Sequence, residues 1–248
     1  MLTVVPTPIG NLGDITFRAV EALRQADWIA AEDTRHTSIL LRHYEISKPQ
    51  ISLHEHNEAS RSAELVRRMQ EGSKVALVSD AGTPGISDPG YRLIRECLAA
   101  GLPVTVLPGA CAAITALVGS GLGLSSFTYE GFLPHKSGKR QRLIEAALAR
   151  DHTTVFYESP HKILRSLLAI AALDPGRKVC VARELTKKFE QFHRGTAAEL
   201  AAAFQQRPPK GEICLLVSGR NSESPVPPDR EHETHTHDSP ENEADEPE

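Results

Sequence analysis

Short β-branched runs alternate with longer stretches of helical periodicity through the first half of this 248-residue chain. In the first helical stretch Phe17, Val20 and Leu23 recur every third residue, which gives one apolar face. Strands that alternate with helices form a mostly parallel sheet with helices on both faces. An α/β fold is therefore predicted, with strands near residues 2–5, 28–31, 50–53, 75–78 and 104–107 and helices near 16–25, 37–43, 59–70, 91–100 and 110–119.

A second series of elements follows the Gly-Leu-Gly-Leu-Ser-Ser link at 121–126. The runs at 179–183 and 190–194 are too close for a crossover helix, so they are expected to pair antiparallel in a mixed sheet. The link predicts two helix-flanked domains, 1–122 and 127–220. The second domain is expected to hold strands near 127–131, 153–157, 179–183, 190–194 and 213–217 and helices near 139–150, 160–173 and 196–205.

The last 28 residues, 221–248, differ in composition from the rest of the chain. They hold ten acidic residues, one basic residue and almost nothing apolar, so they are expected to form a disordered acidic tail. Without them the chain has 27 basic and 22 acidic residues, a net charge of +5. A mildly basic body permits a polyanionic partner without requiring one.

Several functional classes are disfavoured by what the sequence lacks. No run approaches the roughly 18 apolar residues of a membrane span, and no secretory signal opens the chain, so a cytoplasmic protein without a membrane partner is expected. There is no GxxxxGK[ST] phosphate loop. His54-Glu55-His56 offers no third ligand, so no metal is predicted.

The stretch SDAGTPGISDPG at 79–90 directly follows the predicted strand at 75–78. It is compatible with a rigid connector, or with a ligand loop whose glycines let the backbone approach a bound molecule. Loops 6–12, 32–35 and 108–110 follow other strands of the same predicted sheet. Because ligands bind at the carboxyl ends of parallel strands, this convergence favours the ligand interpretation.

Three smaller motifs each have two interpretations. Asp33-Thr34-Arg35 could cap a helix or supply reactive groups, with function slightly favoured. Ser159-Pro160-His161-Lys162 matches SxxK but is better explained as a helix start, with Ser159 as N-cap and Pro160 at the first helical position. The basic residues at 136–142 and 187–188 could lie on solvated surfaces or contact phosphates on both sides of a substrate.

Seven motifs, taken in order, resemble those of the tetrapyrrole-methylase superfamily, and within it the branch that methylates 16S ribosomal RNA on a ribose oxygen. They cover nearly all of residues 1–220 and read PTPIGNLGDIT (6–16), AEDTRHT (31–37), SDAGTPGISDPG (79–90), LPGACAAITAL (107–117), GFLP (131–134), FYESPHKI (156–163) and RELTKKFEQFHRG (183–195).

The resemblance implies a two-lobed methyltransferase that binds S-adenosylmethionine in a cleft between its lobes, as a homodimer. Relatives that act on tetrapyrroles usually carry Gly-Asp-Pro where this chain has Gly82-Thr83-Pro84, which argues against a porphyrin-type substrate. The cofactor contacts that the resemblance implies are Pro8, Gly82, Thr83, Pro84, Ser87, Cys111, Ala112, Glu158 and Leu185.

The substrate implied by the resemblance is a cytidine of the decoding centre, at position 1402 in the usual 16S numbering, in the 30S subunit. A proton acceptor would assist transfer to its 2′-hydroxyl, and Asp33 and Glu184 are the candidates, with Arg35, Lys187 and Lys188 orienting nearby phosphates. The expected RNA contacts are Lys136, Lys139, Arg140 and Arg142. Two alternatives stay open: a methyltransferase of the same fold for a tetrapyrrole or other small molecule, and a non-catalytic ribosome-binding protein.

Overall fold

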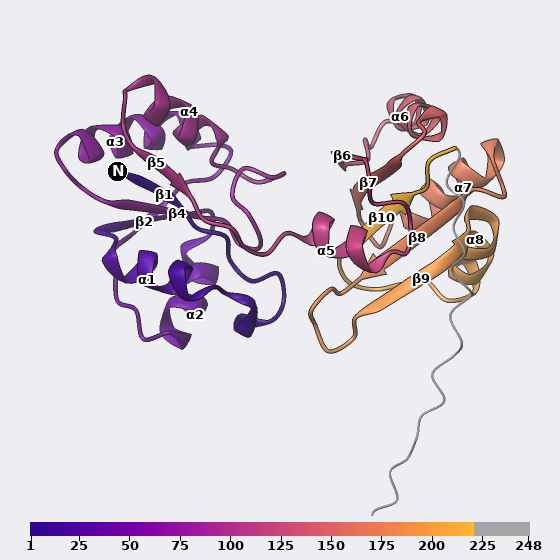
Figure 1. The fold of residues 1–248 in the computed structure, drawn as a ribbon, viewed down its shortest axis with the longest axis horizontal. Helices are drawn as coiled ribbons and strands as arrows, with labels where there is room; N and C mark the ends of the chain where they lie inside the picture. The colour runs from indigo at the N-terminus through magenta and orange to yellow at the C-terminus, as the bar shows by residue number, and fades with distance from the viewer. Residues whose placement is uncertain (221–248) are drawn as a thin grey trace, which may run out of the picture.

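The computed structural model describes residues 1–220, which form two lobes, each built on a five-stranded sheet (Figure 1). The predicted acidic tail, 221–248, lies outside the described residues. We use "first lobe" for the first sheet with α1–α4 and "second lobe" for the second sheet with α6–α8. The helix α5 (Ala112–Gly119) connects them along the chain.

The first sheet is entirely parallel, in the order β3-β2-β4-β1-β5, as the alternation of elements predicts. All four residues of β4 at its centre are buried, because helices cover both of its faces. The strands are β1 (Leu2–Val4), β2 (Trp28–Ala31), β3 (Gln50–Ser52), β4 (Val75–Val78) and β5 (Val104–Val106).

Two pairs of helices cover the first sheet on opposite faces (Figure 1). Leu23 of α1 (Phe17–Gln25) and Leu40 of α2 (Thr34–His43) belong to one hydrophobic cluster. Leu65 of α3 (Glu58–Gln70) and Leu93 of α4 (Tyr91–Ala99) belong to another. The helix α2 begins at Thr34, three residues before the predicted start, because the Asp33 side chain accepts a hydrogen bond from Arg35 N and caps it.

The second sheet is mixed, in the order β6-β7-β10-β8-β9. Only β6 and β7 pair parallel, and β8 and β9 form the predicted antiparallel pair. The strands are β6 (Phe127–Phe132), β7 (Thr153–Glu158), β8 (Lys178–Arg183), β9 (Gln191–Thr196) and β10 (Ile213–Val217). The helices α6 (Ser137–Ala149), α7 (Ile163–Leu173) and α8 (Ala197–Gln206) pack on one face, and α5 packs on the other.

The predicted start of α7 is wrong. The helix begins at Ile163, not at Pro160, and Lys162 occupies the N-cap position in place of Ser159. The Ser159 carbonyl accepts hydrogen bonds from Lys162 N at 2.9 Å and Ile163 N at 3.0 Å, which closes a turn before the helix. Residues 159–160 are therefore free to face the space between the lobes.

Within residues 1–220, no helix combines the length and apolar character that crossing a membrane requires.

Candidate functional site

A cavity of about 320 Å³ lies between the lobes, and we call it the pocket. Its volume is within the range of small-molecule sites, and most of its wall is apolar. The first lobe and α5 contribute Ile9, Ala81, Gly82, Thr83, Ile86, Ser87, Asp88, Cys111 and Ala112. The second lobe contributes Phe132, Tyr157, Glu158, Ser159, Pro160, Ala182, Leu185, Gly211, Glu212, Ile213 and Cys214.

The loop after β4 forms the first-lobe wall of the pocket. Gly82 (φ 77°) and Gly85 (φ 85°) adopt left-handed backbone conformations that favour glycine. Gly82 exchanges two backbone hydrogen bonds with Thr7, at 2.9 and 3.0 Å, and Thr83 Oγ1 donates to the Ala110 carbonyl at 3.0 Å. Neighbouring loops therefore hold this stretch so that its backbone faces the cavity.

Two contacts join the walls of the two lobes. The hydroxyls of Ser87 and Tyr129 are hydrogen-bonded at 2.6 Å. Gly10 approaches the loop after β8 so closely that a Cβ atom there would lie 2.5 Å from Lys187 Cγ and 3.0 Å from the Leu185 carbonyl oxygen. At Gly10 the two lobes thus approach so closely that there is no room for a side chain.

The charged side chains in the pocket wall are all acidic: Asp88, Glu158 and Glu212. Within the described range, 1–220, no Lys, Arg or His lines it. A negative, mostly apolar cavity suits a ligand that carries positive charge and apolar surface. The sulfonium and amino groups of S-adenosylmethionine meet this requirement, so the residues present fit the cofactor that the motifs imply.

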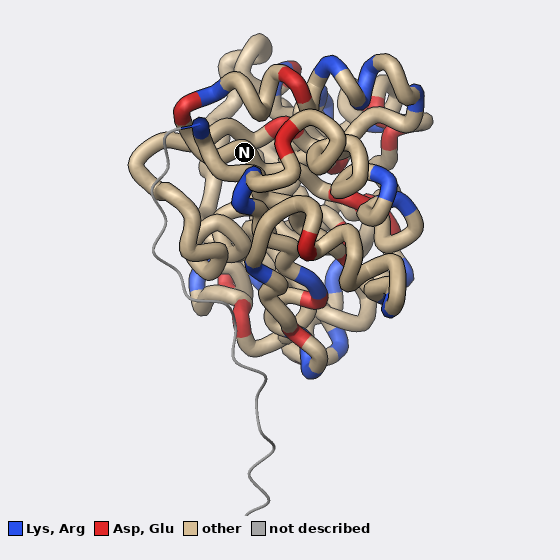
Figure 2. The backbone as a smooth tube through the Cα atoms, turned by 90° about the vertical axis from the view of Figure 1, so that its right-hand side faces the viewer, with Lys and Arg blue, Asp and Glu red and all other residues tan. Residues whose placement is uncertain are grey.

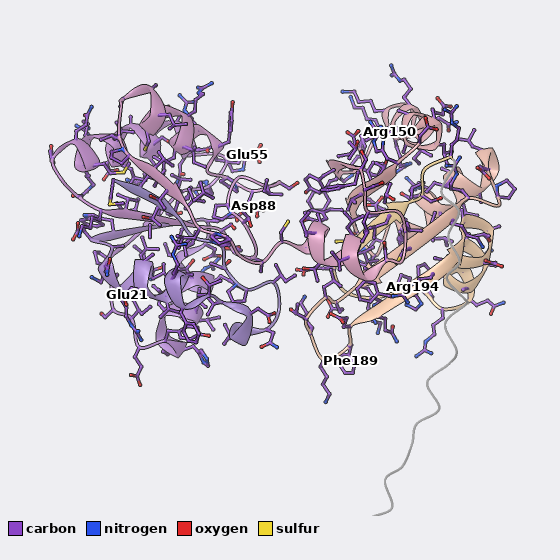
Figure 3. All side chains as sticks on the ribbon, viewed as in Figure 1. Glu21, Glu55, Asp88, Arg150, Phe189 and Arg194 are labelled. Carbon is purple, nitrogen blue, oxygen red and sulfur yellow. The ribbon has the colours of Figure 1, made fainter. Side chains whose placement is uncertain are left out.

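Asp88 lies on the side of the first lobe that faces the second (Figure 3). Burial raises its pKa to about 6, the negative charges of Glu32 and Asp80 add to this effect, and a hydrogen bond from Ser79 opposes it. Burial also raises the pKa of Glu32, and the nearby charges of Asp80 and Asp33 act in the same direction. The pocket wall therefore holds a carboxylate that is unusually basic for an aspartate.

Seven of the nine predicted cofactor residues line the pocket, and Pro8 and Pro84 do not. Pro84 is buried beneath the loop, and Pro8 is half-buried. The structure thus brings together residues from four separate motifs, and their contact with a cofactor stays a prediction. The seven are Gly82, Thr83, Ser87, Cys111, Ala112, Glu158 and Leu185.

The predicted acceptor Asp33 does not line the pocket. It caps α2, and its carboxylate binds the Arg35 side chain, Oδ1 to Nε at 3.1 Å and Oδ2 to Nη2 at 2.6 Å. These hydrogen bonds hold the pKa of Asp33 well below its ordinary value. A carboxylate so strongly stabilised in its ionised form is a weak base.

The second predicted acceptor, Glu184, also lies outside the pocket wall. Its Oε1 accepts hydrogen bonds from Glu212 N at 3.0 Å and Lys187 Nζ at 3.1 Å, and its side chain packs over Gly211. Although burial acts to raise it, these partners keep the pKa of Glu184 below its ordinary value. Glu184 and Lys187 thus hold the turn before β10, and Lys188 is exposed with Nζ 5.7 Å from the Phe189 ring centroid.

The four predicted RNA contacts divide into two groups. Lys136, Lys139 and Arg142 are exposed at the start of α6, whereas Arg140 is only 4% exposed and packs inward, so its assignment as a surface RNA contact is wrong. Basic and acidic positions are interspersed over the side of the molecule in Figure 2, so any RNA contact depends on local groups.

Sequence reasoning missed several residues of the pocket wall. Asp88 lay within the quoted glycine-rich stretch, and its position after a strand was a usable signal. Phe132 and Tyr157, whose ring centroids are 5.5 Å apart, lay within the quoted motifs GFLP and FYESPHKI, but aromatic residues in strands usually pack in the core. Among residues 1–220, no group of three or more His, Cys, Asp or Glu side chains is arranged to hold a metal.

Comparison with solved structures shows the fold. The structure of a diphthine synthase superposes with a TM-score of 0.67 at 18% identity, covering 88% of this chain and 89% of that one. Uroporphyrin-III C-methyltransferase from Thermus thermophilus, in complex with S-adenosylhomocysteine, superposes with a TM-score of 0.59 at 14% identity, covering 88% and 96%. At these identities the likeness concerns the fold alone.

Sequence comparison gives nearer relatives. The proteins named "Ribosomal RNA small subunit methyltransferase I" from Synechocystis sp. and Escherichia coli O157:H7 are 50% and 51% identical to this chain, over 90% of it and 80% and 79% of their own lengths. The protein of that name from Bacillus subtilis is 45% identical over 90% of this chain and 76% of its own. Residues 1–201 match the family model described as tetrapyrrole (corrin/porphyrin) methylases, and the chain belongs to this family.

Proposed function

We propose that this protein transfers the methyl group of S-adenosylmethionine to the ribose 2′-oxygen of a decoding-centre cytidine, position 1402, of 16S ribosomal RNA in the small subunit. The observation that carries the proposal is the 45–51% identity, over 90% of the chain, to proteins named ribosomal RNA small subunit methyltransferase I. A ribosomal substrate also agrees with the expected cytoplasmic location.

The pocket is the proposed cofactor site. Ile9, Leu185 and Ile213 supply apolar surface for the nucleoside, the backbone of Gly82 and Thr83 can approach it closely, and the carboxylates of Glu158 and Glu212 favour a cation. The cofactor supplies a methyl group already activated by its positive sulfur. The protein therefore needs mainly to align the accepting oxygen, exclude water and accept one proton.

The RNA is proposed to approach from the side of α6 and of the loop after β8. Lys136, Lys139, Arg142 and Lys188 are exposed there and can neutralise phosphates. Phe132 is 62% exposed yet lines the pocket, so its ring is available to stack on a base drawn out of the RNA.

A homodimer is proposed from exposed apolar residues between the lobes. Val106 on the edge strand β5 is 58% exposed, and Ile114 and Val118 of α5 are 44% and 67% exposed. Such side chains on an edge strand and an adjoining helix commonly mark an interface. Sedimentation velocity checks this, and a monomer at micromolar concentration would contradict it.

The tetrapyrrole alternative has less support. This chain has Gly82-Thr83-Pro84 where relatives that act on tetrapyrroles usually carry Gly-Asp-Pro. Likeness to the uroporphyrin methyltransferases lies at 14–20% identity, so it concerns the fold. A non-catalytic ribosome-binding protein would have no need of a pocket that fits the cofactor.

The test is incubation of the protein with radiolabelled S-adenosylmethionine and 30S subunits from cells that lack this methylation. We expect label in 16S RNA, and mass spectrometry of nuclease fragments should place it on the ribose of the cytidine. Label on a base, or none on the RNA while a porphyrin or corrin precursor is methylated, would overturn the proposal.

A further inference from the structure

Three carboxylates line the pocket, and they differ in their partners. Glu158 accepts hydrogen bonds from Ser159 N at 2.8 Å and Ser166 Oγ at 2.6 Å, and Glu212 binds Lys187 Nζ at 3.0 Å. Among residues 1–220, no salt bridge includes Asp88. The Ser79 hydroxyl, which acts on it, also lies 3.4 Å from the carbonyl oxygens of Ala81 and Gly82. The Asp88 carboxylate is thus available to accept a proton, whereas Glu158 and Glu212 already bind protein groups.

The backbone on both sides of Asp88 is held in place. Ser87 before it has a φ of 63° and is hydrogen-bonded to Tyr129 of the second lobe. After it, Pro89 restricts the backbone, and Gly90 N donates to Glu58 Oε1 at 2.9 Å. Arg92 N donates to the same oxygen at 3.1 Å. A carboxylate on a loop anchored at both ends is preorganised toward the pocket.

The charged groups near Asp88 are acidic. Glu32 follows β2 and Asp80 follows β4, and Glu32 Oε2 accepts a hydrogen bond from Asp80 N at 3.3 Å. On the helix side, Glu58 is occupied by the backbone of α4, and Arg92 pairs with Glu96 at 2.8 Å. Burial, and after it the negative charges of Glu32 and Asp80, raise the pKa of Asp88 to about 6, near the value suited to a base at neutral pH.

We propose that Asp88 is the catalytic base that accepts the proton of the attacking 2′-hydroxyl. The inference rests on the proposed function and assigns the base to a residue of the pocket wall in place of Asp33 or Glu184. A lone pair of the 2′-oxygen forms the new O–CH₃ bond while the S–CH₃ bond breaks and leaves its electron pair on sulfur. The hydroxyl proton passes to the Asp88 carboxylate and afterwards to water.

The decisive variant is Asp88→Asn, which removes the base and keeps the side-chain shape. Its kcat for 30S methylation should fall about 100-fold or more, the lower range for loss of a general base. For the wild type, kcat/KM should rise tenfold per pH unit below about pH 6 and level off above it, because only the ionised carboxylate accepts the proton. In Asp88→Asn this acid limb should disappear.

Binding provides the readout that is independent of turnover. Calorimetry should give Kd values of Asp88→Asn for S-adenosylmethionine and for S-adenosylhomocysteine that both stay within about threefold of wild type, which also shows that the pocket is folded. Weaker binding of the positively charged cofactor alone would make Asp88 a charge partner of the cofactor, and would overturn its assignment as the base.

Two further variants sharpen the test. Glu32→Gln removes a neighbouring negative charge outside the pocket wall, so the acid limb should persist and move to lower pH. Glu21→Gln changes a carboxylate on the outer face of α1 (Figure 3). It should leave kcat, the acid limb of the pH profile and the Kd of the cofactor unchanged. An unaltered limb in Glu32→Gln would contradict the assignment.

Failure of this inference is separable from failure of the proposed function. If wild-type protein methylates 16S RNA and Asp88→Asn does so at the wild-type rate with its acid limb intact, only the role of Asp88 is refuted. If wild-type protein transfers no label to the RNA, the proposed function itself is refuted.

Discussion

The first lobe reaches the pocket through the loops that follow its strands, whereas the second lobe presents residues of the strands themselves, such as Tyr157 and Ile213. A parallel sheet gathers the carboxyl ends of its strands at one edge, so its loops converge there. In the mixed second sheet the strand directions alternate, and a face of the sheet borders the cavity. The first lobe thus lines the pocket with residues of its loops, and the second with residues of its strands and of the loops beside them.

The largest expected effect tests whether the two lobes fold as separate domains, as proposed for 1–122 and 127–220. Phe156 is fully buried in the core of the second lobe, and Phe156→Ala should cost about 3–5 kcal/mol of unfolding free energy there. Trp28, the single tryptophan, lies in β2 of the first lobe. In urea titrations the midpoint followed by circular dichroism should fall. The unfolding free energy derived from Trp28 fluorescence should change by less than about 1 kcal/mol.

The matched variant for the first lobe is Leu23→Ala, which truncates a fully buried side chain of α1. It should lower the unfolding free energy derived from Trp28 fluorescence by about 2–5 kcal/mol. If both variants instead move both signals equally, the chain unfolds as one cooperative unit, and the two-domain proposal fails.

The next effect tests the backbone character of the first-lobe wall. Gly82→Val should weaken binding of S-adenosylhomocysteine at least about 100-fold, or about 2.7 kcal/mol. A φ of 77° strains a β-branched residue, and a Cβ atom would lie 3.3 Å from Ile9 Cγ2, with further atoms in the pocket. Gly138→Val in α6, where a Cβ meets nothing within 4 Å, is the control and should bind normally in calorimetry.

A smaller effect tests whether RNA contacts belong to the second lobe. Combining Lys139→Ala with Arg142→Ala should weaken 30S binding about tenfold at moderate salt, and should reduce the slope of log K against log salt by about 1.5 to 2. Filter binding over a salt series measures both quantities. The pair Arg18→Ala and Arg42→Ala removes two exposed charges from helices of the first lobe, and an equal loss there would refute the distinction.

The smallest effect concerns the hydrogen bond between Ser87 and Tyr129, which joins the two walls. A double-mutant cycle with Ser87→Ala and Tyr129→Phe should give a coupling of about 0.5–1 kcal/mol in S-adenosylhomocysteine binding. The pair Thr128 and His152, hydrogen-bonded at 2.7 Å within the second lobe, is the control. Equal coupling in both pairs would mean that the contact between lobes has no special role.

Much of the fold could be predicted from the sequence, because periodicity and turn residues are local properties. An error arose at Pro160, where the local hydrogen bonds of Ser159 with Lys162 and Ile163 close a turn before the helix, an alternative to a helix start that periodicity does not distinguish. Arg140 shows a signal that was overlooked: it stands four and seven residues before Ile144 and Ala147, the buried positions of α6. That spacing places Arg140 on the inward face of the helix despite its charge.

The residues of the site that could be predicted are those in loops whose glycines and prolines reveal an unusual backbone. Gly82 and Thr83 belong to a stretch whose glycines and prolines indicate an unusual loop, and the structure places both in the pocket wall. Asp33 was selected as a reactive group, yet it is committed to capping α2 and to Arg35. The sequence offered capping as one role for Asp33 and a loop position for Asp88, but which of the two carboxylates lines the pocket depends on the folded structure.

The close approach at Gly10 has a consequence for how members of such a family can diverge. Because the first Cβ atom added at this position would meet Lys187 and the Leu185 carbonyl, it would act as a wedge between the lobes. One substitution there would displace the loop after β8, which includes the wall residue Leu185, while every residue of the pocket wall keeps its identity. Position 10 is thus a place where the spacing of the two walls can change and the chemical groups of the pocket stay the same.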